Sequence, residues 1–346
     1  MVRAIEWVDD GSAIRLIDQT LLPHREEYVE VTTVDGLVAA IERLAVRGAP
    51  ALGAVGAFGV ALALAQAERE GWSQDHLRTQ LDRLREARPT AVNLAWGVAQ
   101  VRDLVPLGLP AVLAAARQVM AEDTNANTTL ARLGADWLVA RLGARHERIR
   151  VVTHCNTGAL ATTAVGTAYG IIHELHRRGR LGLVYADETR PLLQGSRLTS
   201  WELTTDGIEH VLQADGAAAS TILRGLVDVA IFGADRIAAN GDTANKVGSV
   251  ALALACQRAG IPCVVAAPYS TVDLATRSGA DIHIEERDPA EVLMLAGVPI
   301  APVSAKAWNP AFDVTPHDLI TAIVTERGVV EPAQYPAEDL LATLAG

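Results

Sequence analysis

The chain has 346 residues but only three cysteines, and aromatic side chains make up only 4% of it. The cysteines, Cys155, Cys256 and Cys263, are odd in number and lack CxxC or Cys/His spacing. We therefore predict neither a disulfide framework nor a metal site. Half of the residues are hydrophobic, so the core must be built from Ala, Val, Leu and Ile. The length allows two domains, each with its own core.

The chain also lacks a basic block, and its formal net charge is −11. This charge balance argues against a nucleic-acid surface. It does not exclude a phosphorylated small molecule, because a pocket for one needs only a few local Arg, Lys and backbone N–H groups.

The sequence offers no clear targeting or membrane segment. The first ten residues carry acidic side chains and lack a long apolar core, so we expect no signal peptide and a cytoplasmic location. Residues 48–65 carry no charge. They are mostly Ala and Gly with few large side chains, which favours a closely packed buried helix over a membrane span. We expect no membrane partner.

The sequence also lacks the motifs that bind nucleotide cofactors. Gly53, Gly56 and Gly59 fall inside a predicted helix, and their spacing does not match the dinucleotide-binding motif. The sequence contains no P-loop either. We therefore expect no cofactor, and neither NAD nor ATP in particular.

The first third of the chain predicts short strands followed by helices. Apolar and polar residues alternate over 13–17 and 28–31, within a strand region from about 4 to 34. Thr33 is suited to cap a helix that ends at 44. Further helices are predicted over 51–69, 73–86, 90–104 and 109–142.

The pattern changes near Ile149, after the charged run 145–148. Predicted strands over 149–153, 181–186, 227–232, 263–267 and 281–284 alternate with helices, including 158–178, 199–206 and 246–259. Residues 217–223 add a short strand or helix. This alternation is typical of a doubly wound parallel sheet. We therefore predict an α/β chain. A small domain of antiparallel strands and a helical bundle spans 1–145, and a Rossmann-like catalytic domain spans 146–346.

Polar side chains follow each predicted strand, at the edge where ligands of such sheets bind. Cys155 lies where the strand 149–153 ends and a Gly-containing turn leads into a predicted helix. Helix N-termini attract anions and favour thiolates. Cys155 could therefore be reactive and lie beside a bound phosphate, or it could be an inert buried residue.

Three other candidates also allow two interpretations. Asp235 follows the apolar run 229–234, where burial would raise the pKa of a carboxyl group and suit it to general acid catalysis. It could equally cap the next segment. Lys246 opens a predicted helix and could bind phosphate or remain a solvated charge. His154 is predicted to be packed rather than to act as a base, because adjacent strand residues face opposite sides.

At these residues the chain resembles the S-methyl-5-thioribose-1-phosphate isomerase family of methionine salvage. The wider superfamily includes the regulatory subunits of translation initiation factor 2B and archaeal ribose-1,5-bisphosphate isomerases. The resemblance covers essentially the whole chain. Its matching blocks are 46–53 (VRGAPALG), 88–94 (RPTAVNL), 153–158 (THCNTG), 188–191 (ETRP), 194–199 (QGSRLT), 233–236 (GADR), 245–248 (NKVG), 285–287 (EER) and 309–313 (NPAFD).

The resemblance implies a homodimer with its pocket between the two predicted domains. It implies Cys155 and Asp235 as the catalytic pair. The substrate contacts that it implies are Arg47, Gly48, Ala49, Arg88, Gln194, Asn245 and Lys246.

The implied reaction converts an aldose 1-phosphate into a ketose 1-phosphate, and the full set of blocks favours the methylthio sugar. One alternative is a related pentose phosphate, either 5-deoxyribose 1-phosphate or ribose 1,5-bisphosphate. Another is a non-catalytic regulatory subunit of the same superfamily. Retention of both Cys155 and Asp235 argues against that second alternative.

Overall fold

The computed structural model describes residues 3–10, 12–88, 92–335 and 340–341. The chain divides into two compact units. Unit 1 contains Met1–Thr128 and Thr157–Gly166, and unit 2 contains Thr129–Asn156 and Thr167–Gly346. The predicted boundary at 145 differs from this division, because helix α5 (Leu109–Leu142) runs without interruption through the boundary of the two units.

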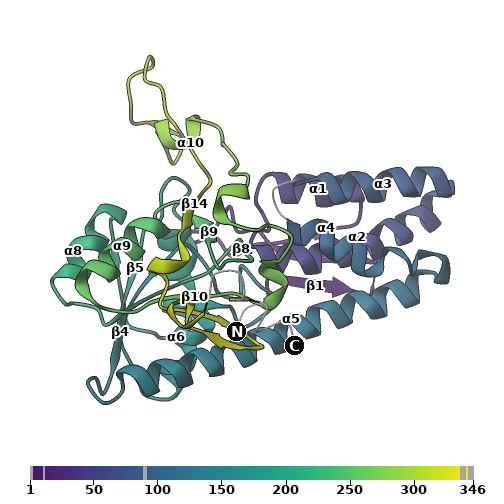
Figure 1. Ribbon diagram of the computed structural model, residues 1–346. Helices are drawn as coiled ribbons and strands as arrows, with labels where there is room; N and C mark the ends of the chain where they lie inside the picture. Colours follow the sequence, from purple (N-terminus) through teal and green to yellow (C-terminus); the bar gives the residue numbers. More distant parts are fainter. Residues whose placement is uncertain (1–2, 11, 89–91, 336–339, 342–346) are drawn as a thin grey trace. The chain divides into compact units, whose positions relative to one another are not determined.

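Unit 1 combines a three-stranded antiparallel sheet with helices (Figure 1). Its strands are β1 (Ile5–Val8), β2 (Ala13–Ile17) and β3 (Tyr28–Val31). Its helices are α1 (Val34–Glu42), α2 (Ala49–Glu70), α3 (Gln74–Glu86), α4 (Val92–Arg102), the short 3₁₀ turn Val105–Leu107 and the first part of α5. The predicted strands and helices here are confirmed, and the Thr33 hydroxyl caps α1 by accepting the Gly36 N–H. The predicted start of α4 at Thr90 lies outside the described residues.

Helix α2 is the uncharged stretch of the sequence. It is long and apolar enough to cross a membrane, but 94% of its most apolar window is buried inside the protein. Glycines on both helices let α2 and α4 approach closely, since a Cβ on Gly56 of α2 would lie 2.5 Å from the Leu94 carbonyl oxygen and one on Gly97 of α4 would lie 1.9 Å from the Gly53 carbonyl oxygen. The prediction of a closely packed buried helix is confirmed.

Unit 2 is built on a seven-stranded sheet in the order β16-β15-β10-β7-β4-β5-β6. The strands are β4 (Ile149–His154), β5 (Leu181–Asp187), β6 (His210–Gln213), β7 (Val229–Phe232), β10 (Cys263–Ala266), β15 (Ala322–Thr325) and β16 (Gly328–Val330). Every neighbouring pair is parallel except β15 and β16.

Helices cover both faces of this sheet (Figure 1). The second part of α5, α6 (Ala168–Arg177) and α7 (Ser200–Thr205) pack on one face, where Val151 and Val229 belong to their core. On the other face, α8 (Ala218–Leu223) and α9 (Ser249–Ala259) pack against Val152 and Ala230. The predicted Rossmann-like, doubly wound parallel sheet is therefore confirmed.

A second sheet of four strands lies in the same unit, in the order β11-β8-β9-β14. Its strands are β8 (Arg236–Ala238), β9 (Thr243–Lys246), β11 (Val272–Asp273) and β14 (Phe312–Thr315). Helix α10 (Ala290–Leu293) and the hairpin β12 (Met294–Leu295) to β13 (Val298–Pro299) form an arm that extends away from these sheets (Figure 1).

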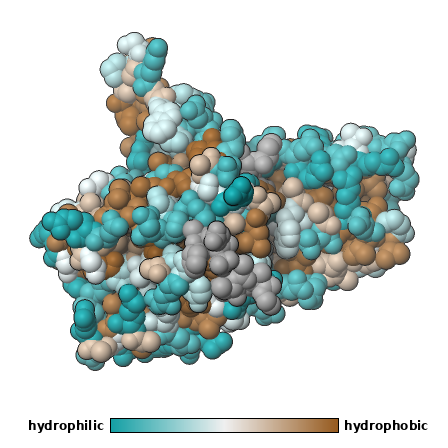
Figure 2. All heavy atoms as spheres, viewed as in Figure 1, coloured by the Kyte–Doolittle hydropathy of each residue, from teal (hydrophilic) through white to brown (hydrophobic). Residues whose placement is uncertain are grey.

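The arm exposes several large hydrophobic side chains. Figure 2 shows hydrophobic and polar residues interspersed over the visible face, with hydrophobic residues also on the arm. The exposed large side chains of the arm and its return are Met294, Leu295, Val298, Ile300, Val303 and Trp308.

Three predicted elements were wrong in part or in whole. The helix predicted over 158–178 begins only at Ala168, because Thr162 and Thr163 bond to nearby backbone and to Asp123 instead of continuing a helix. The helix predicted over 246–259 begins at Ser249, since β9 continues to Lys246, which pairs with Phe312 of β14. Residues 281–284 form no strand, because mutual hydrogen bonds of Ser278 and Asp281 shape a 3₁₀ turn.

Candidate active site

The two predicted catalytic residues follow neighbouring strands of the main sheet. In the register of β4 with β7, His154 lies opposite Phe232. Cys155 is the next residue after β4, and Asp235 comes three residues after Phe232. Both residues therefore lie at the carboxyl ends of adjacent parallel strands, the edge at which such sheets bind ligands.

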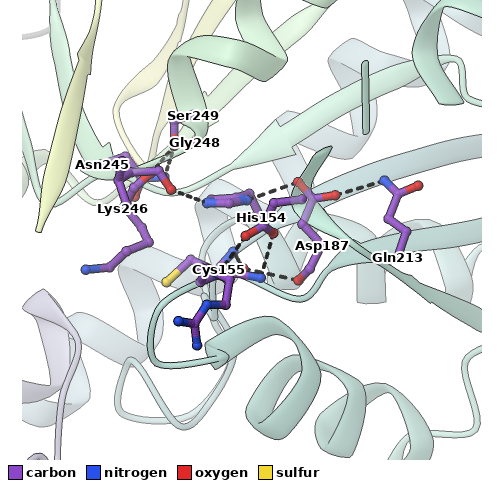
Figure 3. A network of polar contacts seen from close by, with 12 residues as sticks. His154, Cys155, Asp187, Gln213, Asn245, Lys246, Gly248 and Ser249 are labelled. Carbon is purple, nitrogen blue, oxygen red and sulfur yellow. Dashed lines mark hydrogen bonds and ion pairs between the residues drawn. The ribbon is translucent and has the colours of Figure 1, made fainter. Parts of the chain in front are cut away.

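Cys155 lies in a tight, left-handed turn that is fixed by threonines. Its φ is +63°, and its side chain is only 7% exposed. Its N–H donates to the Thr189 hydroxyl at 2.9 Å, and its carbonyl accepts the Thr199 hydroxyl at 2.6 Å. The expected helix N-terminus beside Cys155 is wrong, because residues 158–167 are not helical. Figure 3 shows the sulfur pointing away from the His154 ring, on the side where the Lys246 chain lies.

The loop after β5 supports this turn. Thr189 also has a positive φ, +63°, and its hydroxyl donates to the Asp187 carbonyl. The Asp215 carboxylate accepts the N–H groups of Thr189 and Arg190, each at 2.7 Å. Two residues other than glycine in the left-handed region, joined by one hydrogen bond, indicate strain that the surroundings must hold. Such strain is concentrated at functional sites.

Asn245 and Lys246 belong to β9 of the second sheet, and Asp235 directly precedes β8 of that sheet. The Asp235 N–H donates to the Ala244 carbonyl, which places Asp235 beside β9, and its side chain is half-buried. Asn245 donates to the Ser249 hydroxyl at 2.7 Å. Lys246 is only 8% exposed. Its ammonium donates to the Ala311 carbonyl at 2.6 Å and lies 4.7 Å from the centre of the Phe312 ring.

Gln194 lies directly before a π-helical turn, Gly195–Thr199, that leads into α7. A Cβ on Gly195 would lie 1.6 Å from the Asp187 carbonyl oxygen, so only glycine fits there. The buried Gln194 side chain has an amide oxygen with no hydrogen-bond partner among the described residues. A buried amide oxygen of this kind is suited to accept a hydrogen bond from a ligand.

The predicted contacts on the N-terminal side, Arg47, Gly48, Ala49 and Arg88, lie in unit 1. Gly48 has a φ of +102° and lies just before α2, and a Cβ there would lie 2.3 Å from the Ala161 carbonyl oxygen. The Ala51 N–H donates to that same carbonyl. Gly48 therefore fixes the start of α2 against the segment 157–166 of unit 1. Arg47 and Arg88 are each partly exposed.

His154 is packed, as predicted, but it is also ion-paired (Figure 3). Its Nδ1 lies 3.0 Å from Asp187 Oδ2, and its Nε2 lies 2.9 Å from the Val247 carbonyl oxygen. Burial acts to lower the pKa of His154, but the hydrogen bond to Asp187 and the charges of Asp187 and Asp215 outweigh it and raise that pKa. Burial raises the pKa of Asp187, against the opposing effect of His154. Because the pKa values of His154 and Asp187 are both raised, the pair retains the proton that the two side chains share.

Sequence reasoning missed Asp187 and its neighbour Gln213, whose amide donates to Asp187 Oδ1 at 2.8 Å. A signal was present, because Asp187 directly follows the predicted strand 181–186, the next strand along the chain after the one that precedes Cys155. Side chains at the ends of adjacent parallel strands meet at one edge.

His154, Asp187 and Asp215 could also be considered as metal ligands, since their donor atoms lie within 4.8 Å of one another. The hydrogen bonds argue against that use. Both Asp215 oxygens accept backbone N–H groups, and both Asp187 oxygens have partners. A metal would have to displace these bonds, so the three groups fit a proton-sharing network better than a cation site.

Gly248 allows His154 to pack where it does, which gives a test of the arrangement. Its φ is +113°, and a Cβ there would lie 2.8 Å from Cε1 of the His154 ring. We expect Gly248→Ala to lower the free energy of unfolding by about 3 kcal/mol, through strain and overpacking. Urea denaturation measures the loss.

Gly260, at the other end of α9, is the matched control. Its φ is +69°, and nothing lies within 4 Å of its Cβ position. Gly260→Ala should cost only about 1 kcal/mol, from backbone strain alone. Equal losses in the two variants would contradict the close contact between Gly248 and the His154 ring.

Comparison with known proteins finds similar sequences and structures over nearly the whole chain. Residues 45–332 match the initiation factor 2 subunit family. A methylthioribose-1-phosphate isomerase of Anaeromyxobacter sp. is 50% identical over 346 residues, which cover 99% of this chain and 97% of that protein. The crystal structure of 5-methylthioribose 1-phosphate isomerase from Pyrococcus horikoshii is 38% identical. It matches with a TM-score of 0.87 over 100% of this chain and 96% of its own.

A third relative is longer. It is a probable bifunctional methylthioribose-1-phosphate isomerase/methylthioribulose-1-phosphate dehydratase of Nocardia farcinica, 51% identical over 328 residues. The match covers 94% of this chain but only 59% of the length of that protein. On the full-length matches, the chain belongs to the initiation factor 2 subunit family and, within it, to the methylthioribose-1-phosphate isomerases.

Proposed function

We propose that this chain is an aldose–ketose isomerase in L-methionine salvage. It converts S-methyl-5-thio-α-D-ribose 1-phosphate into S-methyl-5-thio-D-ribulose 1-phosphate. The observation that carries this proposal is the pair Cys155 and Asp235 at the ends of adjacent strands, in a chain 50% identical over 99% of its length to a methylthioribose-1-phosphate isomerase.

The first chemical task is to open the sugar ring. The phosphate on the anomeric oxygen prevents the free equilibrium between ring and aldehyde that other sugar isomerases use. In our proposal, Asp235 is a protonated acid that donates its proton to the ring oxygen as the bond from C1 to that oxygen breaks.

The second task is to move a hydrogen from C2 to C1 while the C2 hydroxyl loses its proton. Cys155 could remove the C2 proton, with an enol as intermediate, and return a proton to C1. Alternatively the hydrogen could move as a hydride, a route favoured by a site that excludes water. Running the reaction in deuterated water distinguishes the routes, because deuterium at C1 of the ketose requires the proton route.

Recognition of the phosphate and hydroxyl groups is assigned to the remaining residues. Lys246 brings a buried cation, and the Gln194 amide oxygen is available to a sugar hydroxyl. The further proposed contacts are Asn245 in unit 2, and Arg47, Gly48, Ala49 and Arg88 in unit 1.

Lys246→Met gives a direct test of phosphate binding. The variant keeps the length and apolar stem of the side chain but loses its charge, so we expect kcat/KM for the sugar phosphate to fall by about 10–100-fold. The chain has only two lysines, and the other, Lys306, is exposed on the arm. Lys306→Met is the matched control and should stay within about twofold of wild type. Equal effects of the two substitutions would remove Lys246 from the site.

A comparison of three sugar phosphates as substrates tests the proposed activity. The purified chain is offered the 1-phosphates of methylthioribose and 5-deoxyribose, and ribose 1,5-bisphosphate, under identical conditions. We expect kcat/KM to be highest for the methylthio sugar, because a methylthio group needs an apolar wall whereas a second phosphate needs a second cationic cluster. A higher value for the bisphosphate would replace the proposed substrate.

The same assay separates an enzyme from a non-catalytic regulatory subunit, since only the enzyme turns over substrate alone. We further propose that the chain works in the cytoplasm as a homodimer. Light scattering on the purified protein should give twice the 36.6 kDa mass of one chain. A monomer with full activity would contradict the dimer.

A further inference from the structure

A row of buried polar side chains lies beneath the turn that carries Cys155, and every hydrogen in it can be assigned. The Val247 carbonyl can only accept, so His154 Nε2 must carry a hydrogen. The Thr221 hydroxyl donates to Gln213 Oε1, so the Gln213 amide nitrogen faces Asp187 and donates to it. One proton then lies between Asp187 and His154 Nδ1, and the pair is equivalent to an imidazolium beside a carboxylate.

This network costs more than packing would require. A buried ion pair is expensive to desolvate, and apolar side chains of similar size fill a core at least as well. Something other than bulk stability must account for a charged pair at this place. Its position suggests what that is, because the pair touches two segments that carry proposed site residues of unit 2.

One segment is the turn of Cys155, which is joined to His154 by a peptide bond. The other is the end of strand β9, where Lys246 is joined to Val247, the residue whose carbonyl accepts from the His154 ring. Asp187 at the end of β5 holds the ring from the other side (Figure 3). A change in ring position would therefore alter the spacing between the thiol and the cation.

We propose that His154 and Asp187 are positioning residues that hold Cys155 in register with Lys246 during isomerisation. This inference rests on the proposed function of the site. Neither side chain needs to touch the substrate. The pair acts through the geometry of Cys155, where a displacement of about 1 Å can cost about 100-fold in rate.

The charges around the ring set the expected pH dependence. The titratable groups that face His154 are Asp187 from β5, Asp215 from the turn before α8 and Asp313 from β14, and all are acidic. They favour the protonated ring, consistent with the raised pKa of His154. When pH rises through that pKa, the ring loses one N–H and with it one of its two bonds. Activity should therefore fall on the alkaline side.

Asp187→Asn tests the proposal with little change in shape. The Asn amide can donate to Nδ1 of a neutral ring and still accept from Gln213, so the hydrogen bonds can re-form, but without the charge they are weaker and hold the ring less firmly. Protonation of that ring would now break a bond, so the loss of activity should move from the alkaline side to the acid side. We expect kcat at neutral pH to fall by at least about 10-fold, with KM changed by less than about threefold.

Asp228→Asn is the matched control. Asp228 is another buried carboxylate, at the opposite end of β4, where it accepts from the N–H and guanidinium of Arg150. Its loss should lower stability but leave kcat and its pH profile within about twofold of wild type. Equal losses of kcat in the two variants, or a wild-type pH profile in Asp187→Asn, would overturn the proposal. If Asp187→Asn does not fold, Gln213→Met keeps the charged pair but removes the bond to Asp187 Oδ1 and the acceptor of the Thr221 hydroxyl, and it should lower kcat in the same direction but less.

The rate at which iodoacetamide alkylates Cys155, measured by mass spectrometry, tests the positioning role independently of the proposed function. Cys256 and Cys263 are each only 1% exposed and serve as internal references. A loosened turn should raise the alkylation rate of Cys155 at least about threefold in Asp187→Asn, but not in Asp228→Asn. Wild-type protein without isomerase activity, together with this difference, would reject the function and keep the positioning role. An active wild type without the difference in alkylation or in pH profile would reject the positioning role alone.

Discussion

Cys155→Ser is expected to lower kcat by at least about 100-fold, the lower end of what a group that handles hydrogen contributes. A hydroxyl is a much weaker acid than a thiol and gives up its proton less readily. The hydrogen bonds that hold the turn use the backbone of Cys155, through Thr189 and Thr199, so they remain in the variant. The loss should therefore appear in kcat, while the fold and substrate binding persist.

Cys263→Ser is the control for this experiment. Cys263 begins β10, the neighbour of β7 in the same sheet, and is fully buried. The same change of atom there should lower the midpoint of thermal unfolding but leave kcat within about twofold of wild type. Wild-type turnover in a folded Cys155→Ser variant would remove Cys155 from the mechanism. Equal loss in both variants would point to a general effect of the substitution on the fold.

Much of the fold was predictable because its signals are local. Alternation of apolar residues located β2 and β3, and the length of the helical pattern located α5 from Leu109 to Leu142. The alternation of strands and helices after Ile149 gave the doubly wound sheet. Each of these features depends on residues that are close in the sequence.

The elements that were missed depend on distant partners. Asn245 and Lys246 continue strand β9 only because β14 pairs with them, whereas β8 pairs with the first part of β9, at Thr243 and Ala244. The dipeptide Asn240-Gly241 before β9 predicts a turn and is common in β-hairpins, but by itself it does not show how far the second strand continues. Strand β15 is a short apolar run of four residues, and such a run cannot be distinguished from a buried helix by periodicity.

The candidate site divides in the same way. The strand-end rule brought out Cys155 and Asp235 from the sequence, and the resemblance added the predicted substrate contacts. The partners of His154 could not be predicted, because the ring is held by Asp187, 33 residues away, and by the Val247 carbonyl, 93 residues away. A histidine on the apolar side of a strand carries no sign of the carboxylate that meets it.

Asp235→Asn is the second substitution expected to remove turnover, again by at least about 100-fold in kcat. Asn has the size of Asp, and the backbone bond from Asp235 to the Ala244 carbonyl does not involve the side chain. The amide can still donate a hydrogen bond to the ring oxygen but cannot release a proton to it. Ring opening should therefore become limiting, while titration calorimetry still detects binding of the sugar phosphate within about 10-fold of wild-type affinity.

Asp242→Asn is the control for this substitution, because Asp242 lies in the turn between β8 and β9, the hairpin that Asp235 precedes. It shows whether a loss of turnover comes from the missing acid or from damage to the hairpin. Burial raises the pKa of Asp242, but hydrogen bonds from Asn240, His317 and Gly279 outweigh it and lower that pKa. Asp242 therefore contributes stability above about pH 4 that is lost as the pH falls further. Its replacement should reduce the free energy of unfolding at neutral pH and leave kcat unchanged. If Asp242→Asn instead lost turnover as fully as Asp235→Asn, the integrity of the hairpin rather than an acid at position 235 would explain both.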